Sequence, residues 1–567
     1  MRNYFHFALY FFIAILLMIE VNELAQAQTS AGSQLQEIQK LSPSTNGLPE
    51  AVPEVSPLLP KLLTPKPGQL TFVIKQFVFV GNKRVSSDEL QNIVVDFLNK
   101  PITFNDLQQV TDLISQYYRE QGWLVRAILP EQDITGGVIT VRIIEAKLGD
   151  IVIDNQSKRV STERVETWVY GRIPKASDLS LKELDRALLT LNDLPDVAVV
   201  GTLQEGAKPG ETNLLLTVTD KPLFAGQVSV DNYGSSSTGI VRESVQANLN
   251  GPLGIGDQVS VYGLYTQGSA YGRLSYTAPV GTSGLRVGIN GSTMDYRVIN
   301  QTFQSLYANG NANTGGVEAS YPIIRSRPAN LMAIGNWNYS DFKNWTIAGL
   351  NSDQTYNTNV TQVGLSGNIL DDFMGGGLNV GSVMVSGGDI NRNSAGQYNS
   401  YYGVAGSFAK MLYNFNRLQA VTDSLSAYVA VSGQLTSKNM DSSQQLYLGG
   451  PTSVRAYGSG QGPASQGNLS TFELRQSLPY STQLAAFYDL GNVQTWKFNN
   501  SLINTANNTY ALQGYGLSIS WVGPYNFNIV GTWAQRAGQL TQSVTNYLNQ
   551  NGGTSLNRFW VTASVPF

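Results

Sequence analysis

From Ala225 to the last residue, the chain is a succession of amphipathic segments of roughly ten residues, about sixteen in all. Apolar and polar side chains alternate along each segment, as they do along a strand whose two faces meet different environments. Short turns alternate with longer loops, the longest at 438–469, 493–508 and 536–557. This pattern predicts a transmembrane antiparallel β-barrel of about 16 strands over residues 223–567.

The last segment has the clearest alternation, with the apolar face Phe559, Val561, Ala563, Val565 and Phe567. A terminal aromatic residue such as Phe567 resembles the C-terminal signature of bacterial outer-membrane proteins, which implies recognition by the barrel-assembly machinery. A soluble β-sandwich would also alternate. It is disfavoured by the even hairpin meander, by the terminal aromatic residue and by the export segment described next.

The N-terminus has the features of an export signal. Arg2 precedes an apolar run from Phe7 to Ile19, and the small residues Ala25 and Ala27 follow it. The run is too short for a membrane anchor, so residues 1–27 are interpreted as a cleaved signal peptide.

Residues 28–70 divide into two parts. Leu35, Ile38 and Leu41 have roughly helical spacing and predict a short helix over Gln34–Leu41. A Pro-rich stretch follows, with Pro43, Pro49, Pro53, Pro57, Pro60, Pro65 and Pro67. It has no core-forming pattern and reads as an extended linker, with a disordered N-terminus as the alternative.

Residues 71–222 differ from the rest in charge. They hold 17 Lys/Arg and 21 Asp/Glu, whereas the 345 residues from Leu223 onward hold only 30 charged side chains. This drop marks the predicted boundary between a soluble region and a membrane region.

The soluble region shows the order β-α-α-β-β twice, over residues 71–147 and 148–222. In the first unit a strand over Phe72–Asn82 is followed by helices that open at the capping boxes of Ser86 and Thr103. In the second, helices are expected over Thr162–Tyr170 and after Ser180. Taken alone, the pattern indicates a small α+β domain repeated once.

Several function classes are disfavoured by composition. The net charge is −3 and the chain has no cysteine, and its single histidine, His6, lies in the segment expected to be removed. These features argue against a nucleic-acid surface, thiol chemistry, histidine triads and the usual zinc sites. No metal, cofactor or enzymatic activity is therefore expected.

One loop and one strand carry the candidate functional residues. The loop LYLGGPTSVRAYGSGQG (446–462) supplies Gly449, Gly450, Val454, Arg455 and Tyr457, and the strand segment FYDLG supplies Phe487, Asp489 and Gly491. If the apolar face of that strand meets lipid, Asp489 points into the lumen. A charge there is costly unless it is hydrated or paired, so Arg455 is its expected partner. Glu473 and Arg475 also face the lumen by alternation, which leaves Glu473 as the alternative partner.

These motifs, GG-x-x-S-V-R-A-Y and F-x-D-x-G, resemble those of the two-partner secretion transporters, the TpsB family (ShlB/FhaC/HecB group). The order and lengths of the segments agree over almost the whole chain. Ala456 stands where the family usually has glycine, which places the loop conformation in question if the turn there needs positive φ.

The resemblance implies an outer-membrane transporter whose two POTRA domains lie in the periplasm. It implies secretion of a large partner exoprotein, of adhesin or haemolysin/cytolysin type, in unfolded form, with its N-terminal region bound by the POTRA domains. It also implies that the N-terminal helix plugs the pore and that the 438–469 loop folds into the lumen. An outer-membrane protein insertase of the same superfamily is the alternative, although insertases usually carry more POTRA domains.

Overall fold

The computed structural model describes the chain in the following ranges: 30–42, 48–51, 71–134, 136–175, 177–208, 210–300, 307–345, 353–392, 403–498, 508–541, 544–545, 548 and 555–567. The expected signal peptide and most of the Pro-rich linker lie outside them. Within these ranges no helix is long and apolar enough to cross a membrane.

The first α+β unit packs two helices against a three-stranded sheet of order β2-β5-β4. Its elements are β1 (Phe72–Val73), β2 (Gln76–Val80), α3 (Ser87–Ile93), β3 (Pro101–Ile102), α4 (Phe104–Glu120), β4 (Val125–Ile128) and β5 (Val138–Glu145). The capping boxes of Ser86 and Thr103 open α3 and α4 as predicted. The single strand expected over Phe72–Asn82 is wrong, because the amides of Lys75 and Gln76 both donate to the Gly137 carbonyl and split it into β1 and β2.

The second unit repeats the arrangement, with sheet order β6-β8-β7. Its elements are β6 (Lys147–Asn155), α5 (Thr162–Tyr170), α6 (Leu181–Asn192), β7 (Val197–Glu205) and β8 (Glu211–Asp220). Trp168 is fully buried at the centre of its core. In both units the middle strand pairs in parallel with the first strand of the sheet and antiparallel with the other.

Backbone hydrogen bonds join the two units. The amide of Leu179 donates to the carbonyl of Ala146, and that of Leu181 donates to Gly122, each at 2.9 Å. The Arg84 guanidinium donates to Asp178, and this bond lowers the pKa of Asp178 below its ordinary value. Contacts made by the main chain itself hold the pair in one relative orientation.

Sixteen of the described strands close into an antiparallel barrel, in which the last strand pairs with the first. This confirms the predicted fold class. The strands are β9 (Phe224–Asp231), β10 (Arg242–Asn250), β11 (Gln258–Thr266), β12 (Ser269–Val280), β13 (Leu285–Arg297), β14 (Asn309–Arg325), β15 (Ala329–Trp345), β16 (Asp353–Asp371), β17 (Gly377–Arg392), β18 (Gly406–Ala420), β19 (Leu425–Thr436), β22 (Gln466–Leu478), β23 (Thr482–Gln494), β24 (Thr509–Val522), β25 (Asn528–Ala537) and β26 (Asn557–Pro566).

The barrel wall has an apolar outer face. Along β22 and β23 the outward residues Phe472, Leu474 and Leu484 are exposed, while inward-facing Asp489 is buried and inward-facing Glu473 is half-buried. An outer band of this kind is the surface that lipid chains solvate.

The final residue takes part in closing the barrel. Phe567 and Gly226 of β9 exchange two backbone hydrogen bonds of 2.9 Å. The Phe567 ring lies on Gly226, where a Cβ atom would come within 2.3 Å of it. Phe567 therefore contacts the first strand directly, and its recognition by the assembly machinery stays a prediction.

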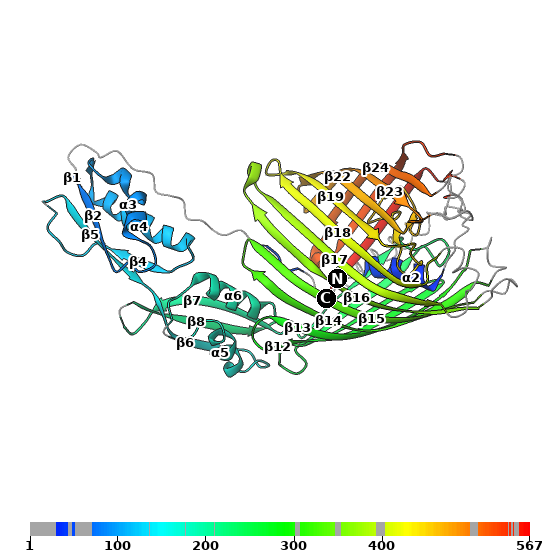
Figure 1. Cartoon of the computed structure of the whole chain (residues 1–567), viewed down its shortest axis with the longest axis horizontal. Helices are drawn as coiled ribbons and strands as arrows, with labels where there is room; N and C mark the ends of the chain where they lie inside the picture. Colours follow the sequence, from blue (N-terminus) through cyan, green and yellow to red (C-terminus); the bar gives the residue numbers. More distant parts are fainter. Residues whose placement is uncertain are drawn as a thin grey trace.

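The second unit is fastened to one end of the barrel (Figure 1). Three arginines donate to carbonyls at the ends of barrel strands: Arg164 to Ile255, Arg172 to Ser283 and Arg186 to Pro322, at 2.5, 2.8 and 2.7 Å. Arg325 of β14 completes the junction by a bidentate pair with Asp193, with both N–O distances 2.8 Å. These contacts lie on one side of the mouth, at β10 to β14.

Helix α2 (Ala31–Leu41) lies inside the barrel (Figure 1). It begins three residues before the predicted start, because Ser30 and Ser33 form a capping box. Its apolar face, formed by Ala31, Leu35 and Ile38, packs in a buried cluster with barrel residues such as Phe342 and Tyr356. Hydrogen bonds add to this packing: Ala31 N donates to Asn344, Thr238 donates to Gln34, Gln36 donates to the Ser443 carbonyl and Lys40 donates to the Tyr447 carbonyl. Helix α2 thus occupies the lumen through an apolar face packed on the wall and through hydrogen bonds to the wall and the loop.

Deleting residues 30–42 is expected to raise the single-channel conductance of the protein in planar bilayers. The reason is that the deletion removes α2 from the lumen without removing any residue of the barrel wall. Equal conductance and gating in the deletion variant and the parent would contradict a plugging role.

Candidate functional site

The loop between β19 and β22 folds into the barrel and forms the candidate site. It contains two short paired strands, β20 (Leu446–Tyr447) and β21 (Pro463–Ala464). It ends at Ser465, so the predicted end at 469 is wrong, because residues 466–469 continue the alternation of β22. The other two long loops also lose residues to β23 and β25 at their ends.

Backbone hydrogen bonds give the tip of this loop a compact shape. Val454 N donates to the Leu448 carbonyl at 2.9 Å, and Tyr457 N donates to the Val454 carbonyl at 3.0 Å. Gly450 N in turn donates to the Tyr457 carbonyl at 3.0 Å. This local folding presents Arg455 to the wall of the barrel.

Arg455 contacts Asp489 through three hydrogen bonds. Its backbone amide and Nε donate to Asp489 Oδ2 at 3.1 and 2.9 Å, and Nη2 donates to Oδ1 at 2.8 Å. Thr471 of the neighbouring strand adds a fourth bond at 3.0 Å. Asp489 is 0% exposed, so its charge depends entirely on these donors.

Glu473, the alternative partner, binds the same arginine. Arg455 Nη1 donates to Glu473 Oε1 at 2.7 Å, and Arg475 Nε donates to Glu473 Oε2 at 2.7 Å. The two arginines and two carboxylates therefore form one neutral cluster of alternating charges. Arg455 therefore pairs with both Asp489 and Glu473, which the sequence analysis treated as alternative partners.

Strand alternation places the whole cluster on the lumenal face. Thr471 lies opposite Asp489 in the β22–β23 register, and Glu473 lies opposite Phe487. The Arg455 guanidinium carbon lies 3.4 Å from the centroid of the Phe487 ring. Phe487 thus adds a cation–π contact beneath the ion pair.

Small residues in the wall let the loop approach it closely. A Cβ atom on Gly491 would lie 2.8 Å from the Val454 side chain, and one on Gly514 would lie 2.4 Å from the Ala456 methyl group. Gly450 has a φ of +122°, which favours glycine. Ala456 has no positive φ, so an alanine is tolerated at this position of the motif.

Sequence reasoning missed two contacts of this loop and the bond from Thr471 to Asp489. Trp560 of β26 donates its Nε1 hydrogen to the Arg455 carbonyl at 2.7 Å. The Arg536 guanidinium lies 4.6 Å from the centroid of the buried Tyr457 ring. Trp560, Arg536 and Thr471 lie outside the two motifs, and strand alternation indicates only that they face inward.

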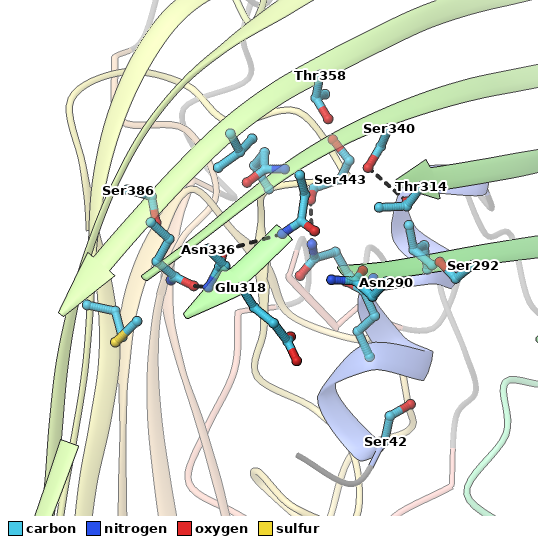
Figure 2. A pocket seen from close by; sticks show the side chains of 18 of the residues that line it. Ser42, Asn290, Ser292, Thr314, Glu318, Asn336, Ser340, Thr358, Ser386 and Ser443 are labelled. Atoms are coloured by element: carbon cyan, nitrogen blue, oxygen red, sulfur yellow. Dashed lines mark hydrogen bonds between the residues drawn. The ribbon is translucent and has the colours of Figure 1, made fainter. Parts of the chain in front are cut away.

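The lumen that remains beside α2 is polar. A cavity of about 490 Å³ lies between the helix, the wall formed by β12 to β18, and the loop at Ser443 and Gln444. Figure 2 shows that hydroxyl and amide side chains line it, among them Asn290, Ser292, Thr314, Asn336, Ser340, Thr358 and Ser386. Such groups donate to and accept from water or a peptide backbone without requiring a particular sequence.

Asp489→Ala is expected to loosen the loop far more than Glu473→Gln. Removing one partner of a buried ion pair costs about 3–5 kcal/mol, although here Glu473 still holds Arg455 and reduces that cost. Native-state proteolysis of the loop should report its opening free energy. A double-mutant cycle with Arg455→Ala should be strongly non-additive. Additive losses would mean that Arg455 and Asp489 do not stabilise each other.

Gly514→Ala is expected to displace the loop, because the new methyl group would meet that of Ala456. Ala456→Gly should be nearly neutral alone and should restore most of the loss in the double variant. Proteolysis of the same loop measures both effects. If Ala456→Gly fails to relieve Gly514→Ala, the close approach of these two positions is not what fixes the loop.

Two family models match the chain. The model described as POTRA domain, ShlB-type, matches residues 72–146. The model described as haemolysin secretion/activation protein ShlB/FhaC/HecB matches residues 210–520 and so covers more than half of the chain.

Curated relatives and solved structures agree with these models. The chain is 28% identical to the heme/hemopexin transporter protein HuxB of Haemophilus influenzae (strain 86-028NP), over 79% of this chain and 81% of that protein. It is 22% identical to the outer membrane transporter CdiB of Dickeya dadantii, over 68% of this chain and 69% of that protein.

Among solved structures, CdiB from Escherichia coli superposes with a TM-score of 0.68 at 19% identity, covering 96% of this chain and 100% of that one. BamA from Haemophilus ducreyi lacking POTRA domains 1–3 superposes with a TM-score of 0.53 at 13% identity, covering 88% of this chain and 100% of that one. At these identities both likenesses concern the fold. The α+β units, the 16-stranded barrel and the matched models lead to one conclusion: this chain belongs to the haemolysin secretion/activation protein ShlB/FhaC/HecB family of outer-membrane transporters.

Proposed function

We propose that this chain secretes one large partner exoprotein, unfolded, from the periplasm to the cell surface. The observation that carries the proposal is a polar lumen, wide enough to hold a helix and a folded loop, joined to a two-domain periplasmic arm. Helix α2 and the 438–465 loop fill this lumen through non-covalent contacts. A channel closed in this reversible way suits the passage of an occasional large cargo.

The POTRA domains are proposed to bind the N-terminal region of the exoprotein. Strand β2 is an edge strand that pairs only with β5, and β7 is an edge strand that pairs only with β8. An extended chain can add to such an edge through backbone hydrogen bonds, largely independently of its side chains. Val80 and Val200 are exposed on these strands and offer apolar contacts beside the edge.

The cargo is proposed to be of adhesin or haemolysin/cytolysin type. Folding of the exoprotein outside the cell would hinder its return and so supply the driving force. The family is one of transporters, and we propose no catalytic step for this chain. We also propose that lipid solvates the outer band of the barrel, and that the assembly machinery recognises Phe567 during biogenesis.

An outer-membrane insertase is the second candidate, because BamA shares this fold. The matched family model and the two POTRA-like units favour secretion. An insertase would act on many barrel proteins, whereas a secretion partner would be specific. Depleting the transporter should therefore abolish export of one exoprotein and leave the abundance of other outer-membrane barrels unchanged; a general loss of barrels would favour the insertase.

Arg455→Ala is expected to reduce secretion sharply while the barrel still assembles, since the outward face of every strand is unchanged. Arg455→Lys is the matched control: it keeps the charge but loses the bidentate bond to Asp489, so it should restore secretion only in part. Exoprotein in the culture medium measures secretion, and heat-modifiable migration of the barrel measures assembly. Full secretion by folded Arg455→Ala would contradict a functional role for the loop anchor.

A further inference from the structure

A short piece of the N-terminal segment, residues 48–51, lies at the mouth of the barrel beside the second POTRA domain. The Pro49 carbonyl accepts a hydrogen bond from Asn368 Nδ2 at 2.7 Å and a longer one from Asn330 Nδ2 at 3.4 Å. Proline has no backbone N–H, so this residue offers only its carbonyl to the wall.

The two asparagines form a prearranged pair of donors. Asn330 of β15 and Asn368 of β16 are register partners, and Asn330 Nδ2 also donates to Asn368 Oδ1 at 2.8 Å. Arg325 Nη1 donates to Asn330 Oδ1 at 2.9 Å, which turns the Asn330 amide so that its Nδ2 faces the linker. Arg325 itself is held by Asp193 at the end of α6. The donors at the mouth are thus oriented by the POTRA domain.

Space for a chain continues next to Pro49. A cavity of about 220 Å³ lies between the end of α6 and the barrel rim. Pro195 of the POTRA domain and Pro322 and Met332 of the barrel line it together with Pro49. The cavity therefore lies between the POTRA domain and the barrel, the two parts of the protein that a cargo would contact one after the other.

We propose that the Asn330–Asn368 pair and the adjoining cavity form an entry site for extended polypeptide, which residues 48–51 occupy as a built-in pseudo-substrate. This inference rests on the proposed function. The pair donates to a backbone carbonyl, a group that every residue of an unfolded chain carries. The site therefore recognises extended backbone independently of the amino-acid sequence. Cargo leaving the POTRA domain meets these donors first and competes with the linker for them. Displacing the linker also frees the segment that follows α2.

The experiment distinguishes two roles of the Asn330–Asn368 pair, anchoring the linker and binding the cargo. In a first variant, Gly-Ser-Gly-Ser replaces residues 48–51, which removes the pseudo-substrate. A net hydrogen bond contributes about 1 kcal/mol, so cargo secretion should rise by about two- to tenfold where entry limits the rate. Asn368→Leu is then added to this variant. It keeps the side-chain size and leaves the Arg325–Asp193 contact in place.

If the site binds cargo, Asn368→Leu lowers secretion in the linker-replaced variant by a similar factor. Asn248→Leu, on lumenal strand β10 away from Pro49, should change secretion little. A photoreactive residue at Met332 should crosslink to cargo stalled during export, more strongly in the linker-replaced variant, and the crosslink should fall with Asn368→Leu. Heat-modifiable migration confirms that each barrel is folded.

If secretion and the crosslink are unchanged by Asn368→Leu once the linker is replaced, the pair only anchors the linker and the inference is wrong. Failure of the proposed function would look different: the unmodified chain would export no exoprotein at all. The chain has no cysteine, so a disulfide between Pro49→Cys and Asn330→Cys offers an independent check. Because Asn330 is itself one of the proposed donors, the reduced form of this double variant is the reference for export. Oxidation should lower export well below that reference; equal export with the disulfide formed would overturn the competition.

Discussion

The buried charge of Asp489 is the constraint on which the lumenal loop depends. A carboxylate without solvent must be met by donors, and Arg455 supplies three of the four that the structure gives it. Because one of these is the Arg455 backbone amide, the contact fixes the main chain of the loop as well as its side chain. Glu473 and Arg475 extend the pair into a cluster of four charges, three from the barrel wall and one from the loop, whose sum is zero.

The loop and α2 contact each other in the lumen, and different interactions hold each of them to the barrel wall. The loop is anchored by buried charges, glycines and ring contacts, which resist separation. Helix α2 is held by the packing of Ala31, Leu35 and Ile38 in a buried apolar cluster. Single hydrogen bonds that involve serine, asparagine, glutamine and lysine side chains add to this packing.

The docking of the second α+β unit links this unit to the wall of the barrel. Arginines on this domain bind carbonyls at β10 to β14, and Asp193 binds Arg325 in return. The same Arg325 orients Asn330 beside the linker. A continuous series of hydrogen bonds therefore runs from the end of α6 to the N-terminal segment. A movement of the second α+β unit can alter the contact of this segment with the mouth of the barrel.

Sequence alone determined the features that follow from periodicity. Alternation over ten-residue segments predicted the 16-stranded barrel, and the same parity placed Glu473, Arg475 and Asp489 on the lumenal face. Capping boxes located α3 and α4 for an equally local reason. Where the main chain departs from its local pattern, as at Lys75 and Gln76, the prediction of one continuous strand failed, because a distant carbonyl decided the hydrogen bonding.

Only the tertiary structure decided which of these inward residues touch. Strand alternation tells which residues face the lumen, but it does not tell where along the barrel a long loop folds back. The partner of Arg455 therefore could not be chosen between Asp489 and Glu473 from the sequence, and the structure places Arg455 between them. Trp560 and Arg536 joined the site for the same reason, since barrel closure brings β25 and β26 next to a loop that precedes them by many residues. The Asn330–Asn368 contact with Pro49 lay equally beyond sequence reasoning, because it joins positions some three hundred residues apart through the closed shape of the barrel.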